Sequence, residues 1–117
     1  MSAVRIYHNP RCSKSRQALA LLEEQGETVE VINYIETPLS NAAISELLQM
    51  LGLSARELMR KGEDTYKELN LANPDLSEAQ LVQSLADYPR LIERPIVVRH
   101  DRAVVARPPE RVLELYS

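Results

Sequence analysis

Cysteine is scarce in this chain: of its 117 residues, only Cys12 carries a thiol. A single cysteine excludes an internal disulfide. It also excludes a dithiol redox centre, because the third residue after Cys12 is Ser15 and not a second cysteine. A zinc site needs several clustered Cys and His ligands, whereas this chain has one Cys and two widely separated His. Redox chemistry at Cys12 therefore requires a thiol from another molecule.

Long hydrophobic runs are also missing, as is a basic-then-apolar leader at Met1-Ser2-Ala3. We therefore expect neither membrane insertion nor secretion, and we expect a reducing cytoplasmic location. The net charge of −3 lacks the positive excess of a general nucleic-acid binder. Lysine is rare, with eleven of the fourteen basic residues being arginine. Arginine's planar fork suits oxyanions, but a genomic bias toward arginine codons explains the excess equally well.

The spacing of apolar residues predicts an α/β fold in one domain over residues 1–117. The order strand, helix, strand at the start indicates a right-handed parallel βαβ unit, and two short apolar runs near the end indicate an antiparallel hairpin. The expected strands cover residues 3–8, 28–33, 95–99 and 102–106; the expected helices cover 13–26, parts of 40–87, and a last helix opened by Pro108-Pro109 with Val112, Leu113 and Tyr116 facing inward. The sum is a thioredoxin-like, four-stranded mixed sheet (βαβ plus ββα) with a helical insert.

Capping signals support the insert. Ser40 precedes one amphipathic helix, and Ser54 and Ser77 each begin a capping-box pattern. The leucine stripes of this segment indicate core packing rather than a cofactor site. In a fold of this order, the proline that opens the third strand usually follows a cis bond and sits against the active-site cysteine, so we expect a cis peptide at Arg94-Pro95.

Cys12 is the candidate nucleophile. It lies between the first strand and the first helix, where free backbone N–H groups and the helix dipole favour an anion. Arg11, Lys14 and Arg16 lie within four residues of it, with no acid among them. A lone cysteine is most often a small buried hydrophobe, but the basic loop around this one favours a reactive thiolate. His8, as a possible cation, and the Ser15 hydroxyl would help to ionise it; each also fits an ordinary structural role.

Two other chemistries lack their sequence signals in this chain. A cysteine phosphatase loop would place an arginine six residues after the nucleophile, where this chain has Ala18. A Ser-His-Asp hydrolase would show a nucleophile elbow, and the sequence contains none.

The sequence resembles the glutathione- and glutaredoxin-linked arsenate reductase family, which is ArsC-like and thioredoxin-like in fold. The resemblance covers nearly the whole chain. It is carried by the segments 6–16 (Ile-Tyr-His-Asn-Pro-Arg-Cys-Ser-Lys-Ser-Arg), 34–38, 58–61, 66–69, 91–98 and 106–108.

The resemblance implies an oxidoreductase of arsenic detoxification with no bound cofactor. It implies that Cys12 attacks arsenate or a similar oxyanion, that His8 and Ser15 favour the thiolate, and that Arg60, Arg94 and Arg107 gather around the oxyanion. Asn9 and Pro95 would shape the site. Glutathione would act as co-substrate, and glutaredoxin would supply the remaining reducing equivalent before arsenite leaves.

Two departures from the family pattern leave alternatives open. The chain stops soon after its last predicted helix, without the C-terminal extension of the detoxifying members, and Arg11-Cys12-Ser13-Lys14 is more basic than the small residues usual there. A reductase of another oxyanion or of an oxidised thiol is one alternative. A thioredoxin-fold regulator without reductase activity is another; the Spx-like regulators of this kind use a two-cysteine switch, which this chain lacks.

Overall fold

The fold is described from a computed structural model that covers residues 4–116 of the chain. The chain forms two compact units. We call them the frame, which comprises Met1–Thr37 and Arg94–Ser117, and the insert, which comprises Pro38–Glu93. The helical insert expected from the sequence is thus a compact unit of its own, while a single domain over residues 1–117 stays a prediction.

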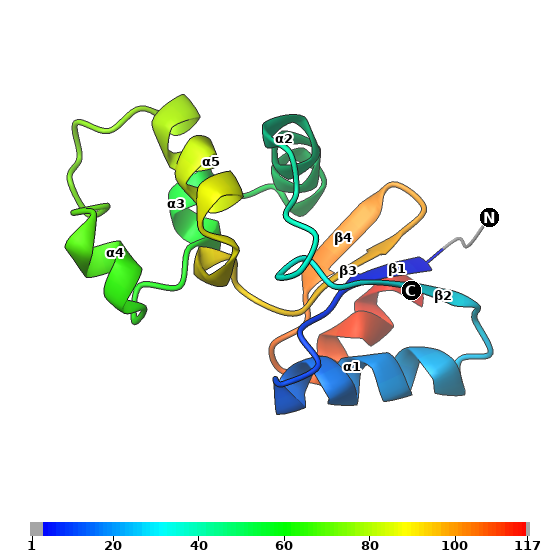
Figure 1. Cartoon of the computed structure of the whole chain (residues 1–117). Helices are drawn as coiled ribbons and strands as arrows, with labels where there is room; N and C mark the ends of the chain where they lie inside the picture. Colours follow the sequence, from blue (N-terminus) through cyan, green and yellow to red (C-terminus); the bar gives the residue numbers. More distant parts are fainter. Residues whose placement is uncertain (1–3, 117) are drawn as a thin grey trace. The chain divides into compact units, whose positions relative to one another are not determined.

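The frame contains the predicted four-stranded mixed sheet (Figure 1). Strand β1 pairs in parallel with β2 and antiparallel with β3, and β3 pairs antiparallel with β4, which gives the order β2-β1-β3-β4. The elements of the frame are β1 (Val4–Tyr7), α1 (Ser13–Glu24), β2 (Val29–Ile32), β3 (Ile96–Arg99), β4 (Arg102–Val105) and the 3₁₀ helix η2 (Pro109–Tyr116). This arrangement confirms the α/β, thioredoxin-like fold class.

One hydrophobic cluster joins these elements. Alternate residues of the strands and one side each of α1 and η2 contribute to it, so both helices cover the same face of the sheet (Figure 1). Its buried members are Val4, Ile6, Ala18, Leu22, Val97, Val104, Ala106, Val112 and Leu115. Helix α1 ends where the sequence predicts, because Gly26 adopts φ +78°, a left-handed conformation that favours glycine.

The last helix differs from the prediction. It is a 3₁₀ helix, in which residues three apart lie in a row, so Pro109, Val112 and Leu115 face the core. The prediction that Leu113 faces inward is wrong, since its side chain is 44% exposed. Tyr116 is half-buried, and the Arg99 guanidinium lies 4.4 Å from the centre of its ring.

The insert is built from short helices, and both predicted capping boxes are present. Ser54 and Ser77 each accept a hydrogen bond from the backbone N–H three residues on, and the side chains of Glu57 and Gln80 accept one in return. The elements are α2 (Asn41–Leu51), α3 (Ala55–Leu58), α4 (Asp64–Glu68), α5 (Glu78–Asp87) and the 3₁₀ helix η1 (Pro89–Leu91). Helix α5 packs against α2 and α3, and the apolar stripes of these helices are buried as core.

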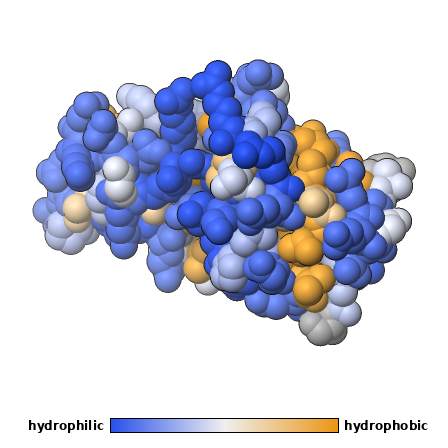
Figure 2. Space-filling view, turned by 90° about the horizontal axis from the view of Figure 1, so that it is seen from below, coloured by the Kyte–Doolittle hydropathy of each residue, from blue (hydrophilic) through white to orange (hydrophobic). Residues whose placement is uncertain are grey.

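The face that Figure 2 shows is mainly hydrophilic, and most of its hydrophobic side chains lie in one strip. Among the described residues, the large hydrophobic side chains with substantial exposure are Val31, Leu69, Tyr88 and Leu113. No helix between residues 4 and 116 combines the length and the apolar character that a membrane crossing requires.

Candidate active site

Cys12 is the N-cap residue of α1, with extended φ and ψ angles of −94° and 121°. A tight loop places it there: the Asn9 carbonyl accepts the Cys12 N–H at 2.9 Å, and the Asn9 side-chain oxygen accepts the Arg11 N–H at 3.0 Å. Arg16, in the first turn of α1, donates from Nη1 to the Pro10 carbonyl at 2.8 Å. The loop is therefore held at both ends, and the thiol, 9% exposed, lies at the start of the helix.

The electrostatic surroundings favour the thiolate. Burial raises the pKa of Cys12, but the backbone N–H of Ser15, the guanidinium of Arg94 and the backbone N–H of Lys14 together outweigh it, so the pKa lies below its ordinary value. The Cys12 side chain makes no capping hydrogen bond in the structure. Donors at a helix N-terminus favour the charged form of a thiol placed there.

His8 and Ser15 form a buried pair next to this loop. His8 Nδ1 lies 2.6 Å from Ser15 Oγ, and Ser15 Oγ also accepts the Asn9 N–H at 3.1 Å. Burial and the charge of Arg16 both lower the pKa of His8. Both effects disfavour the charged imidazole, since burial and a neighbouring arginine oppose protonation. The expectation that His8 favours the Cys12 thiolate stays a prediction. Ser15 reaches the thiolate through its backbone N–H, while its hydroxyl is engaged by His8.

Arg94 and Arg107 come together at the start of β3. Arg94 donates to the Cys12 thiolate, and Arg107 Nη1 donates to the Arg94 carbonyl at 3.2 Å. The Arg94-Pro95 peptide is cis, as predicted, and the Arg107-Pro108 peptide is a second cis bond that the sequence reading did not predict. The Arg94 guanidinium thus lies at the nucleophile, and the Arg107 guanidinium is bonded to the backbone of Arg94.

Arg60 belongs to the insert. Its Nη1 lies 2.6 Å from a Glu63 carboxylate oxygen, and its Nε lies 3.6 Å from a Glu93 carboxylate oxygen. Its backbone N–H donates to the Leu91 carbonyl, next to the isolated bridge between Met59 and Ile92. A role for Arg60 in holding the oxyanion stays a prediction.

Together, the frame residues form a site that suits nucleophilic attack on an oxyanion. It offers a stabilised thiolate, a half-buried guanidinium in contact with it, and backbone N–H groups aimed at negative charge. In the described part of the chain, no group of three His, Cys, Asp or Glu side chains is placed to hold a metal ion.

The sequence identified Arg16 only as a nearby charge, and its hydrogen bond to the Pro10 carbonyl was not predicted. The available signal was its position in the first turn of α1, one helical turn after Cys12.

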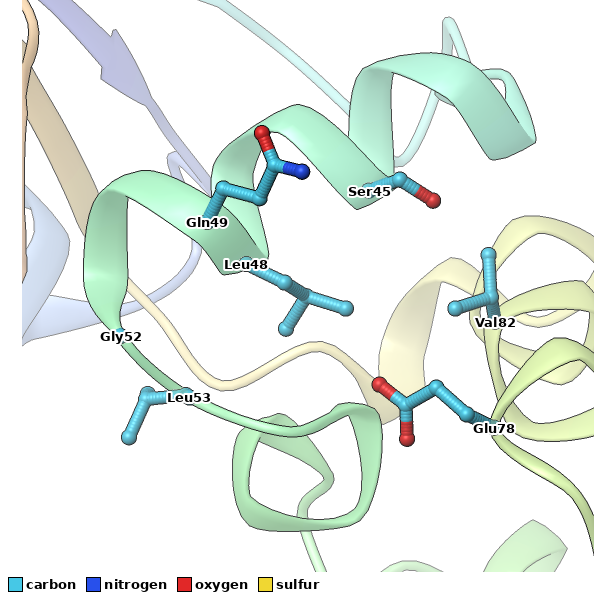
Figure 3. Close-up of a pocket in the computed structure, with 7 residues that line it drawn as sticks. All are labelled: Ser45, Leu48, Gln49, Gly52, Leu53, Glu78 and Val82. Atoms are coloured by element: carbon cyan, nitrogen blue, oxygen red, sulfur yellow. The ribbon is translucent and has the colours of Figure 1, made fainter.

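The insert has a pocket of its own, of about 410 Å³. Figure 3 shows it between α2 and α5, with Leu48, Leu53 and Val82 on its apolar side. Glu78 is its only ionisable side chain, and one Glu78 carboxylate oxygen accepts the Ala55 N–H at 2.9 Å. None of the predicted site residues lines this pocket.

Comparison with known proteins agrees with this picture. The chain is 58% identical over 113 residues to the uncharacterized protein YfgD of Escherichia coli (strain K12), covering 96% of this chain and 95% of that one. It is 49% identical to the arsenate reductase of Neisseria meningitidis serogroup A, covering 96% and 97%. The solved structure of an arsenate reductase from Vibrio cholerae superposes with a TM-score of 0.93 at 54% identity, covering 95% of each chain. The model of the ArsC family matches residues 7–115. The chain belongs to the ArsC family.

Proposed function

We propose that this protein reduces arsenate to arsenite, with Cys12 as the nucleophile and with glutathione and glutaredoxin as the source of electrons. The observation that carries the proposal is the contact between the Arg94 guanidinium and the Cys12 thiolate at the N-terminus of α1. An oxyanion bound there meets the nucleophile and positive charge at the same place. The arsenate reductases among its relatives support the choice of arsenate.

The reaction begins at the sulfur. The Cys12 thiolate attacks arsenic, an S–As bond forms, and one arsenate oxygen leaves as water after taking up protons. Arg94 stabilises the negative charge that builds up on the oxyanion, and Arg107 extends the positive region. Because Ser15 occupies the position where a second thiol would resolve the adduct, the next thiol comes from solution.

Two external thiols complete the electron balance. Glutathione replaces a second oxygen and gives an adduct in which arsenic(V) bridges Cys12 and the glutathione sulfur. The glutaredoxin thiolate then attacks that glutathione sulfur, a disulfide forms, and the electron pair of the broken As–S bond remains on arsenic, which becomes arsenic(III). Hydrolysis of the remaining As–S bond releases arsenite and restores the Cys12 thiolate.

The test is arsenate-dependent NADPH oxidation in the presence of glutathione, glutathione reductase and glutaredoxin. We expect turnover above the protein-free blank, no turnover in Cys12→Ser, and a loss of about 100-fold in Arg94→Ala, the size of effect seen when a charge-stabilising group is removed. Arg111→Gln is the matched control, because Arg111 is an exposed arginine of the frame that bonds to the Val105 carbonyl. Turnover no higher than the blank, or an active Cys12→Ser variant, contradicts the proposal.

A further inference from the structure

Two cations beside Cys12 have no part in the proposed chemistry. The side chains of Arg11 and Lys14 are exposed, and within Val4–Tyr116 neither forms an ion pair. The sequence contains no acidic residue before Glu23, so no neighbouring carboxylate along this stretch neutralises them. The Arg94 guanidinium already interacts with the Cys12 thiolate. The loop thus carries two positive charges, on Arg11 and Lys14, that have no role in the proposed oxyanion site.

Hydrogen bonds of the backbone N–H groups fix the main-chain positions of Arg11 and Lys14. The Arg11 N–H donates to the Asn9 side chain at 3.0 Å, and the Lys14 N–H stabilises the Cys12 thiolate. Both residues therefore lie within two positions of the cysteine at points set by hydrogen bonds, while their charged ends are in solvent. A charged group at the Cys12 sulfur is therefore close to the attachment points of two solvated cations, one and two residues away along the chain.

We propose that Arg11 and Lys14 select the reductant: they favour a small thiol that carries carboxylates over a neutral or cationic one. This inference rests on the proposed function, because it concerns the thiol that attacks the Cys12 adduct. Opposite charges attract at a range of several ångströms in water, and the attraction fades as salt shortens the screening length. At low salt each cation contributes about a twofold preference for one added negative charge.

The step can be isolated from arsenate. Cys12 is first converted to its mixed disulfide with thionitrobenzoate. A small thiolate then attacks the Cys12 sulfur, a new disulfide forms between the two, and the aromatic thiolate leaves with the electron pair of the broken bond. The release of thionitrobenzoate gives a second-order rate constant by absorbance. The constant is expressed per thiolate, because the thiols differ in pKa and in nucleophilicity.

The experiment compares 3-mercaptopropionate, 2-mercaptoethanol and cysteamine, which carry one negative, no and one positive charge besides the thiol. We expect the wild-type protein to prefer 3-mercaptopropionate to cysteamine. At low salt the ratio of their rate constants should fall about 16-fold in Arg11→Gln/Lys14→Gln, because two cations are removed and the two thiols differ by two units of charge. The ratio should also fall as NaCl rises from 20 mM to 500 mM. Lys14→Arg, which keeps the charge, should preserve it, and Arg111→Gln should preserve it too.

A ratio that is the same in the wild type and in the double variant overturns the inference. So does a loss that is equal for all three thiols, since that result would mean a general effect on Cys12. Neither outcome bears on arsenate reduction, because no arsenate is present. Conversely, a protein without arsenate turnover could still show the charge preference.

Discussion

His8 Nδ1 lies 2.6 Å from Ser15 Oγ, and both side chains are buried beside the loop that carries Cys12. The pair is also bonded to the backbone of the loop, because Ser15 Oγ accepts a hydrogen bond from the Asn9 N–H. The hydroxyl of Ser15, at the position where a dithiol motif has its second cysteine, thus has a fixed partner. The pair holds the start of α1 in place.

His8 contributes to the pH dependence of stability in the acidic range. Its pKa is lowered from 6.5 by burial and by Arg16, so the unfolded chain binds a proton more readily than the folded one. His8 therefore contributes stability that is present above pH 6.5 and is lost as the pH falls through the lower folded-state pKa. His8→Asn should cost about 1–3 kcal/mol at pH 7.5, through the lost buried hydrogen bond, and should flatten the pH profile below that value.

Urea unfolding between pH 7.5 and pH 4.5 measures this effect. The control is His100→Asn, because His100 is exposed in the β3–β4 turn with φ 58°, a conformation that asparagine tolerates. His100→Asn should keep the wild-type slope. A His8→Asn variant with the same slope as the wild type would show that His8 is not the group responsible.

The ionisation of Cys12 should depend on Arg94. Arg94→Gln removes both a positive charge and a donor from the thiolate, so the pKa of Cys12 should rise. The rate of alkylation by iodoacetamide, measured across pH, should reach its half-maximum at a higher pH in this variant than in the wild type. Arg111→Gln should leave the profile in place. A profile that is identical for all three proteins would remove Arg94 from the account of the thiolate.

Arg16 links the loop to the histidine. Arg16→Gln removes the charge that disfavours protonation of His8, so the pKa of His8 should move up toward its ordinary value. It also removes the bond to the Pro10 carbonyl, so the Cys12 N–H should exchange faster with solvent. Proton NMR of the His8 ring and amide exchange measure the two effects. An equal shift of the His8 pKa in Arg11→Gln would mean that charge anywhere in the loop suffices.

The 3₁₀ form of η2 can be tested by two identical substitutions two residues apart. Leu115 is 2% exposed and Leu113 is 44% exposed. Leu115→Ala should therefore cost about 2–5 kcal/mol in the free energy of unfolding. Leu113→Ala should change it by less than about 0.5 kcal/mol. Denaturant unfolding of both variants gives the comparison, and a larger loss in Leu113→Ala would favour an α-helical end to the chain.

Local signals explain why most of the fold could be predicted. The β-branched strands, Gly26 after α1 and the capping boxes at Ser54 and Ser77 act within a few residues, so the sequence shows them directly. The type of the last helix could not be predicted in this way, because the spacing of its apolar residues fits both an α-helix and a 3₁₀ helix. Pro109, Val112 and Leu113 match an α-helix, whereas Pro109, Val112 and Leu115 match a 3₁₀ helix, and packing against the sheet decides between them.

The site was predictable to the extent that topology defines it. The strand order and the proline before β3 predict that Arg94 lies near Cys12. The hydrogen-bond partners of individual side chains were harder to predict. The Ser15 hydroxyl could have reached the thiolate or the imidazole, and the charge of His8 depends on burial and on Arg16, neither of which can be read from a motif.

The lone thiol of Cys12 has a consequence for how the small thiols that reach it could be identified. Every disulfide that this chain forms joins it to a different molecule, because it has no second thiol that could displace the partner. Each protein molecule in such a disulfide therefore carries its thiol partner as added mass. If free thiols are blocked at the moment of lysis, the intact mass of the protein records which small thiols reached Cys12 inside the cell and in what proportion.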